Sequence, residues 1–201
     1  MARDECPALP ILLRSVSLTP HPQNKYESAA LRVLNNLHVA DHVPLNGSIS
    51  LTSLAAQLPI SVDALARILR FAITSRVFTE PEKGYIGHSA LSLAMRVPTI
   101  RANLAHNLND AYVAAANLPE AIETFPNGEE PNETAFNLAF GTELDYWKYI
   151  AQPGQEGQRA DFHGSMQEWT NGQACSPHHL LRGNMDWKAL PEGALVVDVI
   201  P

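Results

Sequence analysis

The end of the chain places the strongest constraint on its fold, because residues 194–199 read Ala-Leu-Val-Val-Asp-Val. A continuous run of valine and leucine is typical of a strand buried on both faces of a parallel sheet. In nucleotide-type α/β domains such a strand leads into a glycine-containing turn and a helix. Here a turn at Pro191-Glu192-Gly193 comes before the run, and Ile200 and Pro201 follow it. The pattern predicts the first strand of an α/β domain without the glycine turn.

The composition suits one globular domain, with room for a small second lobe. The chain has 201 residues, of which 45% are hydrophobic and 17% are charged, so it can bury a sizeable core. Its net charge is −7, and it has only 14 lysine and arginine residues. Because binding to nucleic-acid phosphates needs clustered basic side chains, we expect no nucleic acid as a partner.

The cysteines and the start of the chain bear on location. Cys6 and Cys175 lie far apart without metal-ligand spacing, so they predict neither a disulfide framework nor a metal site and suit a reducing compartment. The short apolar run near the start is interrupted by Pro7 and Pro10 and is too short to cross a membrane. We expect a cytoplasmic protein with no membrane partner.

Residues 26–88 read as a helix followed by a winged helix. From Tyr26 to Ala40 the apolar residues recur at helical spacing, which predicts one amphipathic helix. Ser50 and Ser61 are suited to cap two further helices. The apolar faces of these two helices comprise Leu51, Leu54, Ala55 and Leu58, then Leu65, Ile68, Leu69 and Ala72. Strands over 76–80 and 85–88, joined by a turn over 81–84, complete the pattern.

A winged helix often binds DNA, but this one has few basic side chains. Its second helix offers only Arg67 and Arg70, and its wing offers only Lys83. We therefore do not expect DNA to be its ligand.

A longer helix is predicted from Pro98 to about Leu118. Its apolar stripe comprises Leu104, Leu108, Ala111 and Ala115. His106 and Asp110 stand four residues apart on a neighbouring face. An aspartate in that place favours and orients a protonated imidazole, as a general acid requires. An exposed surface ion pair has the same spacing, so both interpretations stay open.

Aromatic side chains are dense after a polar loop at 121–131. Short helices predicted over 135–140 and 144–150 carry Phe136, Phe140, Tyr146, Trp147 and Tyr149. These residues suit an apolar ligand cavity and an ordinary core equally well. The next helix, from about Glu156 to Asn171, places Phe162, Met166 and Trp169 on one stripe, with His163, Gln167 and Thr170 beside it.

This helix and the residues after it resemble the middle of the plant and fungal O-methyltransferases that use S-adenosylmethionine. The family has a Phe-His-x-x-Met-x-x-Trp-like helix, a Leu-Leu pair, an Asp-Trp-x-x-Leu-Pro-x-Gly linker and a Val-Val-Asp-Val strand. The matching residues are Phe162, His163, Met166, Trp169, Leu180, Leu181, Asp186, Trp187, Leu190, Pro191, Gly193, Val196, Val197, Asp198 and Val199. The family's next turn, Gly-Gly-x-x-Gly, receives the cofactor and has no counterpart here.

The winged helix is similar to the lobe that precedes the catalytic domain in the same family. The matching segments are Leu51-Leu54-Ala55, Leu65-Arg67-Ile68-Leu69-Arg70 and Phe78-Glu80. The resemblance implies that this lobe dimerises, with the helix at 26–40 in the interface. It also implies that Phe162, Met166 and Trp169 face a flat substrate. Because the glycine turn is missing, we expect the chain to use no cofactor and to transfer no methyl group.

We therefore expect a mainly α fold, with a winged-helix dimerisation lobe, a helical segment and one truncated β-strand. The expected units are a flexible N-terminus (1–24), a winged-helix dimerisation domain (25–96), a helical substrate-wall segment (97–190) and the truncated first strand of a cofactor domain (191–201). An unpaired apolar strand promotes aggregation, so residues 195–199 should be covered by a partner chain or by the protein's own helices.

Two classes of function remain open. In the first, the chain is a cofactor-independent tailoring enzyme of fungal secondary metabolism, which folds a small aromatic or polyketide-like molecule for cyclisation, dehydration or a pericyclic reaction. Its candidate catalytic residues are His106, Asp110 and His163, and its candidate substrate-binding residues are Trp147, Phe162, Met166, Trp169 and Thr170. We favour this class because the helix at 156–171 keeps the family's substrate-facing pattern.

In the second class, the chain is a non-catalytic dimerisation or regulatory partner. It would form a homodimer, or a heterodimer with a full-length methyltransferase. The end of the sequence is explained equally by a protein that is short and by a fragment of a longer methyltransferase.

Overall fold

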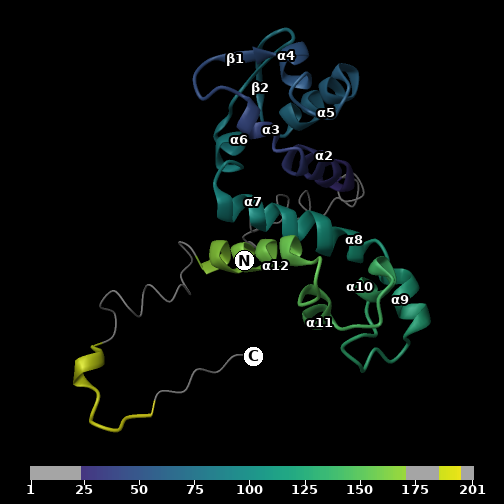
Figure 1. The fold of residues 1–201 in the computed structure, drawn as a ribbon, viewed down its shortest axis with the longest axis vertical. Coiled ribbons are helices and arrows are strands. Elements are labelled where there is room, and N and C mark those ends of the chain that lie inside the picture. Colours follow the sequence, from purple (N-terminus) through teal and green to yellow (C-terminus); the bar gives the residue numbers. More distant parts are fainter. Residues whose placement is uncertain (1–23, 171–185, 196–201) are drawn as a thin grey trace, which may run out of the picture.

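The computed structural model describes residues 24–170 and 186–195, and its fold is mainly α, as predicted (Figure 1). The elements follow in this order: α2 (Asn24–Asn36), α3 (Val39–His42), β1 (Ser48–Ser50), α4 (Leu51–Ala55), α5 (Val62–Thr74), β2 (Thr79–Glu82), β3 (Tyr85–Gly87), α6 (Ala90–Ala94), α7 (Pro98–Ala105), a π-helix (His106–Ala111), α8 (Tyr112–Ala115), α9 (Leu118–Thr124), α10 (Ala135–Phe140), α11 (Tyr146–Ile150), α12 (Glu156–Thr170) and a 3-10 helix (Trp187–Ala189).

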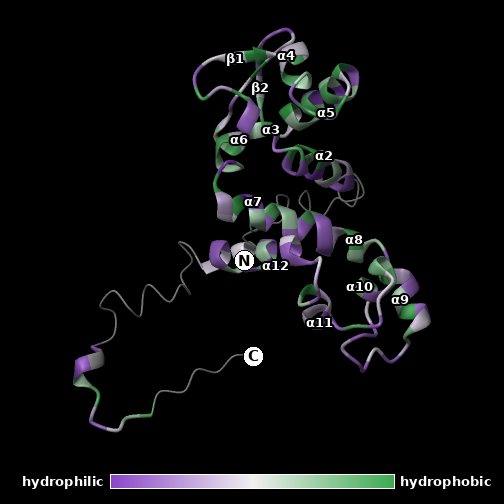
Figure 2. Ribbon diagram, viewed as in Figure 1, coloured by the Kyte–Doolittle hydropathy of each residue, from purple (hydrophilic) through white to green (hydrophobic). Residues whose placement is uncertain are grey.

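The first part of the described chain forms the winged-helix lobe, which contains the main hydrophobic core. Hydrophobic and hydrophilic residues alternate along α2 and α5, so that each helix has an apolar face (Figure 2). The largest fully buried apolar side chains belong to this lobe: Phe78, Leu34, Leu54, Leu65, Leu69, Ile86, Val39 and Val43. The predicted apolar faces of the two capped helices are confirmed at Leu51, Leu54, Ala55, Leu65, Leu69 and Ala72.

Both predicted helix caps of the lobe are confirmed. The hydroxyl of Ser50 accepts a hydrogen bond from the amide of Ser53, at 3.1 Å. The hydroxyl of Ser61 accepts one from the amide of Ala64, at 3.3 Å. Each bond satisfies an amide that has no partner within the first turn of its helix.

The strands of the wing differ in detail from the prediction. The strand expected over 76–80 begins only at Thr79 and continues to Glu82, because Arg76 takes a left-handed conformation with φ of 63°. The strand expected over 85–88 ends at Gly87. The three residues of β1 were not predicted. They pair antiparallel with β3, which gives the sheet order β1-β3-β2.

The predicted single helix from Tyr26 to Ala40 is broken. The helix α2 ends at Asn36, and α3 begins at Val39 after His38, whose φ of 51° lies in the left-handed region. A left-handed residue interrupts the ladder of amide-to-carbonyl bonds and turns the chain. The turn allows both Leu34 and Val39 to be fully buried.

The predicted helix from Pro98 to Leu118 is also interrupted, by the π-helix His106–Ala111. Its amide bonds reach five residues back, as that of Tyr112 does to the carbonyl of Asn107. The wider turn holds an extra residue, so the predicted stripe is wrong beyond Leu108. Asp110 is buried, whereas Ala111 and Ala115 are exposed.

The π-helix also contacts the winged-helix lobe. Asn109 accepts hydrogen bonds from Arg32 and Asn36, both at 2.9 Å, and its amide donates to Asn36 at 3.1 Å. The hydroxyl of Tyr112 donates to the carbonyl of Lys25 at 3.0 Å. One side of α2 is therefore fixed to the long helical segment.

After α8, the helices differ from the predicted boundaries. The loop expected over 121–131 begins later, because α9 runs from Leu118 to Thr124. The helix predicted over 135–140 is confirmed as α10. The helix predicted over 144–150 begins at Tyr146, since Asp145 caps it by accepting from the amide of Lys148 at 2.9 Å.

The end of the chain is described only in part. The turn at Pro191-Glu192-Gly193 is confirmed by a 3.0 Å bond from the amide of Ala194 to the carbonyl of Pro191. Ala194 and Leu195 are not in a strand, and the rest of the predicted strand, 196–199, lies outside the described residues. Of the flexible N-terminus predicted over 1–24, residues 1–23 also lie outside them, and Asn24 is the first residue of α2. In the described part of the chain, every helix is too short or too polar to cross a membrane.

The helices α7 and α12 lie side by side at the centre of the molecule (Figure 1). They approach closely at Gly164, where an added Cβ would lie 2.5 Å from the Cβ of Ala102. That separation is well below van der Waals contact, so a side chain at Gly164 would push the two helices apart.

Replacing Gly164 with alanine is therefore expected to lower the free energy of unfolding. Alanine gains about 1 kcal/mol over glycine in helix propensity, but forcing a methyl group into a packed contact costs about 1–3 kcal/mol. Gly157 lies in the same helix, and a Cβ there meets no atom within 4 Å. Gly157→Ala should raise the free energy of unfolding in denaturant titrations. Equal effects of the two substitutions would contradict the close approach.

His88 links the wing to α3 and α6. Its Nε2 donates to the carbonyl of Val43 at 3.1 Å, so its Nδ1 accepts from the hydroxyl of Ser92 at 2.9 Å. Burial lowers the pKa of His88 below its usual 6.5, the carbonyl of Val43 opposes this, and Arg96 and Asp41 contribute smaller effects of opposite sign.

We expect the stability of the chain to fall as the pH drops below about 6.5, because the unfolded chain then binds a proton at position 88 that the folded chain resists. Above that pH the imidazole of His88 is neutral in both the folded and the unfolded chain, and its contribution to the free energy of unfolding is fully present. His88→Gln keeps a donor and an acceptor but cannot titrate, so its unfolding free energy should depend less on pH between 5.5 and 7.5. Parallel pH profiles for the two proteins would refute this role.

Candidate functional site

The predicted pair of His106 and Asp110 comes together on the π-helix. The Nδ1 of His106 lies 3.2 Å from Oδ2 of Asp110. The Asp110 side chain is only 4% exposed and that of His106 is 18% exposed. The pair is thus not the exposed surface ion pair that the spacing also allowed. A carboxylate buried to this degree needs hydrogen-bond partners.

Two residues that the sequence analysis did not assign to the site supply those partners. The hydroxyl of Tyr146, at the start of α11, donates to Oδ2 of Asp110 at 3.3 Å. The amide of Gln158, in the first half of α12, donates to Oδ1 at 2.7 Å. Three donors from three elements therefore surround one buried carboxylate.

The carboxylate fixes the protonation pattern of His106. Because a carboxylate only accepts hydrogen bonds, Nδ1 of the neutral imidazole must carry the proton and donate it to Asp110. The other ring nitrogen, Nε2, then carries a lone pair, which meets no hydrogen-bond donor among the described residues. It can take a proton from a bound molecule, and Asp110 then stabilises the resulting imidazolium.

Burial and neighbouring charges raise the pKa of two further groups of the site. Burial, and then the negative charge of Asp110, raise the pKa of Tyr146, so its hydroxyl stays protonated and remains a donor. Burial, and then Asp110, also raise the pKa of Asp161, while His106 and His38 act in the opposite direction. Asp161 therefore keeps its proton to higher pH than an ordinary aspartate.

Aromatic rings form one side of the site. The rings of Phe162 and His106 are nearly perpendicular, with centroids 5.5 Å apart, and so are those of Trp147 and Phe162, at 5.1 Å. Tyr146 lies 5.9 Å from Phe162. Trp147 is 61% exposed, so much of its surface is open to a ligand. Such rings bind flat apolar molecules.

The other predicted site residues lie at or beyond the edge of this cluster. His163 is exposed, and its ring lies 5.8 Å from that of Phe162, which directly precedes it. Met166 is half-buried one turn further along, and Trp169 is 59% exposed. The hydroxyl of Thr170 donates to the carbonyl of Gln167 in its own helix, at 2.9 Å.

The residues around Asp110 could be predicted from the sequence to different degrees. The i, i+4 spacing identified His106 and Asp110, and the aromatic density drew attention to Tyr146. Gln158 gave no signal, because a glutamine near the start of a polar helix is ordinary. Among the described residues, no three His, Cys, Asp or Glu side chains gather as metal ligands would.

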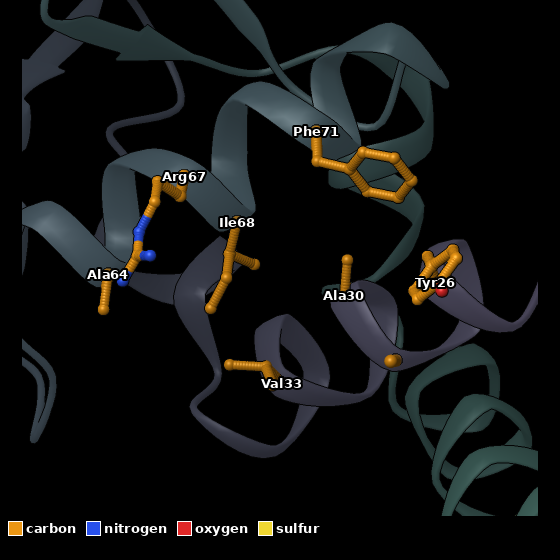
Figure 3. A pocket seen from close by; sticks show the side chains of 8 residues that line it. Tyr26, Ala30, Val33, Ala64, Arg67, Ile68 and Phe71 are labelled. Atoms are coloured by element: carbon orange, nitrogen blue, oxygen red, sulfur yellow. The ribbon is translucent and has the colours of Figure 1, made fainter.

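An apolar groove of about 380 Å³ lies elsewhere, between α2 and α5 of the winged-helix lobe. Figure 3 shows the side chains of the two helices facing each other across it. The residues that line it are Tyr26, Ala29, Ala30, Val33, Ala64, Arg67, Ile68 and Phe71. Tyr26 is 59% exposed and Phe71 is 41% exposed.

Comparison with known proteins identifies the lobe that contains this groove. Residues 21–95 match the family model of the O-methyltransferase dimerisation domain. O-methyltransferase aurJ of Gibberella zeae is 32% identical over 184 residues, which are 90% of this chain and 41% of that protein. O-methyltransferase VdtC of Byssochlamys spectabilis is 34% identical over 183 residues, again 90% of this chain and 41% of that protein.

The fold is also similar to that of a solved structure described as a pericyclic reaction enzyme. The TM-score is 0.64 and the identity is 21%, over 78% of this chain and 42% of that one. The chain thus spans about two fifths of the proteins that it matches. Its residues 21–95 match the O-methyltransferase dimerisation domain, and the chain as a whole resembles the N-terminal part of fungal O-methyltransferases.

Proposed function

We propose that this chain acts in fungal secondary metabolism as a tailoring protein of O-methyltransferase type, in which His106 performs acid–base chemistry on a small aromatic or polyketide-like molecule. One observation carries the proposal. The buried Asp110 holds His106 through Nδ1 and leaves Nε2 to react, beside the aromatic rings of Phe162 and Trp147.

The chemistry is a proton transfer that needs no cofactor. Nε2 of His106 removes a proton from the bound molecule and returns it at a second position or to a leaving hydroxyl group. Proton transfer by a positioned side chain accelerates a reaction by about 10²–10⁴-fold. Holding a flexible molecule against the rings adds to this by orienting its reacting atoms. Cyclisations and dehydrations are the reactions that this arrangement suits best, and a pericyclic step gains from the orientation alone.

The aromatic contacts favour a flat molecule over a charged one. Phe162 and Trp147 offer ring surface, whereas the acidic groups nearby, Asp110 and Asp161, disfavour an anion. Trp169 lies two turns beyond Phe162 on the same helix and would contact only a longer molecule, whereas the ring of His163 lies 5.8 Å from that of Phe162. That the isolated chain neither binds S-adenosylmethionine nor transfers its methyl group stays a prediction. The assay below tests the methyl transfer, because a methylated product would form only when the cofactor is present.

Purified chain is expected to convert one or more polyketide pathway intermediates of a fungal producer without added S-adenosylmethionine. His106→Ala should lower kcat by about 10²-fold or more, because it removes the proton acceptor. The measurement is product formation by liquid chromatography and mass spectrometry, with and without the cofactor. Turnover that requires the cofactor, or that is equal in His106→Ala, would contradict the proposal.

Two further variants assign the effect to the right histidine. His42→Ala changes a half-buried histidine in α3, outside the proposed site, whose Nδ1 lies 3.1 Å from the side-chain oxygen of Gln57, and should retain full activity. His163→Ala tests the other candidate. A larger loss at His163 than at His106 would transfer the acid–base role to the exposed face of α12.

A second candidate function, dimerisation with a homologous chain, is favoured by the groove between α2 and α5. The groove lies in the segment matched to a dimerisation domain. Apolar surface of this kind is stabilised when a partner covers it. A second copy of this chain would form a homodimer, and a full-length methyltransferase with the same lobe would form a heterodimer that this chain could regulate.

We expect the chain to be a dimer at micromolar concentration and Phe71→Glu to be a monomer, because the substitution places a charge in the groove. Leu93→Glu is the matched control, since Leu93 in α6 is also 41% exposed and does not line the groove. Light scattering coupled to size-exclusion chromatography gives the mass. If both variants remain dimeric, the groove is not the interface. If the unchanged chain is a monomer, homodimerisation fails.

A further inference from the structure

Gln158 differs from the other residues around the site, because it contacts Asp110 through a polar group and not through an aromatic ring or an ionisable group. It lies in α12, one turn before Phe162, and its Nε2 approaches Oδ1 of Asp110 to 2.7 Å. This is the shortest of the three contacts to that carboxylate, since those from His106 and Tyr146 measure 3.2 and 3.3 Å.

The geometry divides the two oxygens of Asp110 between different partners. Oδ2 accepts hydrogen bonds from both His106 and Tyr146, while Oδ1 accepts one from Gln158. The amide of Gln158 cannot turn around, because its carbonyl oxygen would then face the carboxylate. Gln158 therefore holds the carboxylate in the rotation that directs Oδ2 at the imidazole.

Removing this donor would affect the proton on His106. Without Gln158, Oδ1 of the buried carboxylate would lack a partner, and the carboxylate would be free to rotate. Oδ2 would then no longer be held against Nδ1 of His106. The imidazole proton would no longer be fixed on Nδ1, so the tautomer that carries it on Nε2 would become populated and would lack the free lone pair on that atom.

We propose that Gln158 is a positioning residue, which keeps His106 in the tautomer that carries its proton on Nδ1 and exposes the lone pair of Nε2. The meaning of this tautomer for catalysis rests on the proposed function. The tautomer itself does not, because it follows from the contacts around Asp110.

Tyr146 supports the same arrangement from the other side. Its hydroxyl lies 3.3 Å from both Nδ1 of His106 and Oδ2 of Asp110. Because burial and the charge of Asp110 raise the pKa of this hydroxyl, it stays protonated at neutral pH, donates to the carboxylate and does not compete for the proton of His106.

The test measures the tautomer directly, by nuclear magnetic resonance of the ring nitrogens of the ¹⁵N-labelled full chain at about pH 8, where an ordinary histidine is neutral. The His106 signals are assigned by their loss in His106→Gln. In the unchanged chain we expect the proton mainly on Nδ1. A proton mainly on Nε2 would overturn the proposal before any variant is made.

Gln158→Met keeps an unbranched side chain of similar length but removes the donor. We expect it to shift the proton of His106 towards Nε2 and to lower kcat about tenfold with little change in KM, as is common when a supporting hydrogen bond is lost. Gln155→Met is the matched control. Gln155 precedes the same helix and donates instead to the hydroxyl of Tyr149, at 3.2 Å, so His106 should keep its tautomer.

The outcomes separate this inference from the proposed function. An unchanged tautomer in Gln158→Met, or an equal shift in Gln155→Met, refutes the role of Gln158 whether or not the chain has activity. A chain that converts no substrate but shows the expected tautomer shift refutes the proposed function and leaves the positioning role intact. Thermal unfolding of both variants, followed by circular dichroism, shows whether each remains folded.

Discussion

The buried carboxylate of Asp110 joins the π-helix to α11 and α12, and the geometry of the site depends on these contacts. A charge that is 4% exposed would cost several kcal/mol without partners, and the chain supplies these from the π-helix, α11 and α12. The requirement is geometric as well as energetic. The three elements must converge on one point, and the close approach of α12 to α7 at Gly164 permits this.

The winged-helix lobe could be predicted from the sequence largely because its signals are local. Ser50 and Ser61 cap their helices as any serine before an apolar repeat would, and the buried faces of α4 and α5 follow from helical spacing. The break at His38 could not be predicted, since a histidine rarely takes a positive φ and the burial of Leu34 and Val39 imposes it here. The strand β1 is only three residues long and depends on pairing with β3.

The site was predicted only in part, for a related reason. Spacing placed His106 and Asp110 together, but it could not tell a buried pair from an exposed one. Spacing also assumed an α-helix, and the π-helix shifted every later position by one residue. Gln158 was missed because its role exists only when α12 lies against the π-helix. Contacts between distant elements leave no periodic trace in the sequence.

The π-helix has a further consequence, for the way in which such a site is gained or lost. Its wide turn needs one residue more than an α-helical turn of the same span, and that residue turns Asp110 inward while Asn109 meets Arg32 and Asn36 of the lobe. Substitutions alone cannot remove an extra residue from a helix. Deleting one codon within this segment would restore regular spacing and rotate the residues beyond it by about 100°. The orientation of this site therefore depends on the length of the helix as much as on the identity of its side chains.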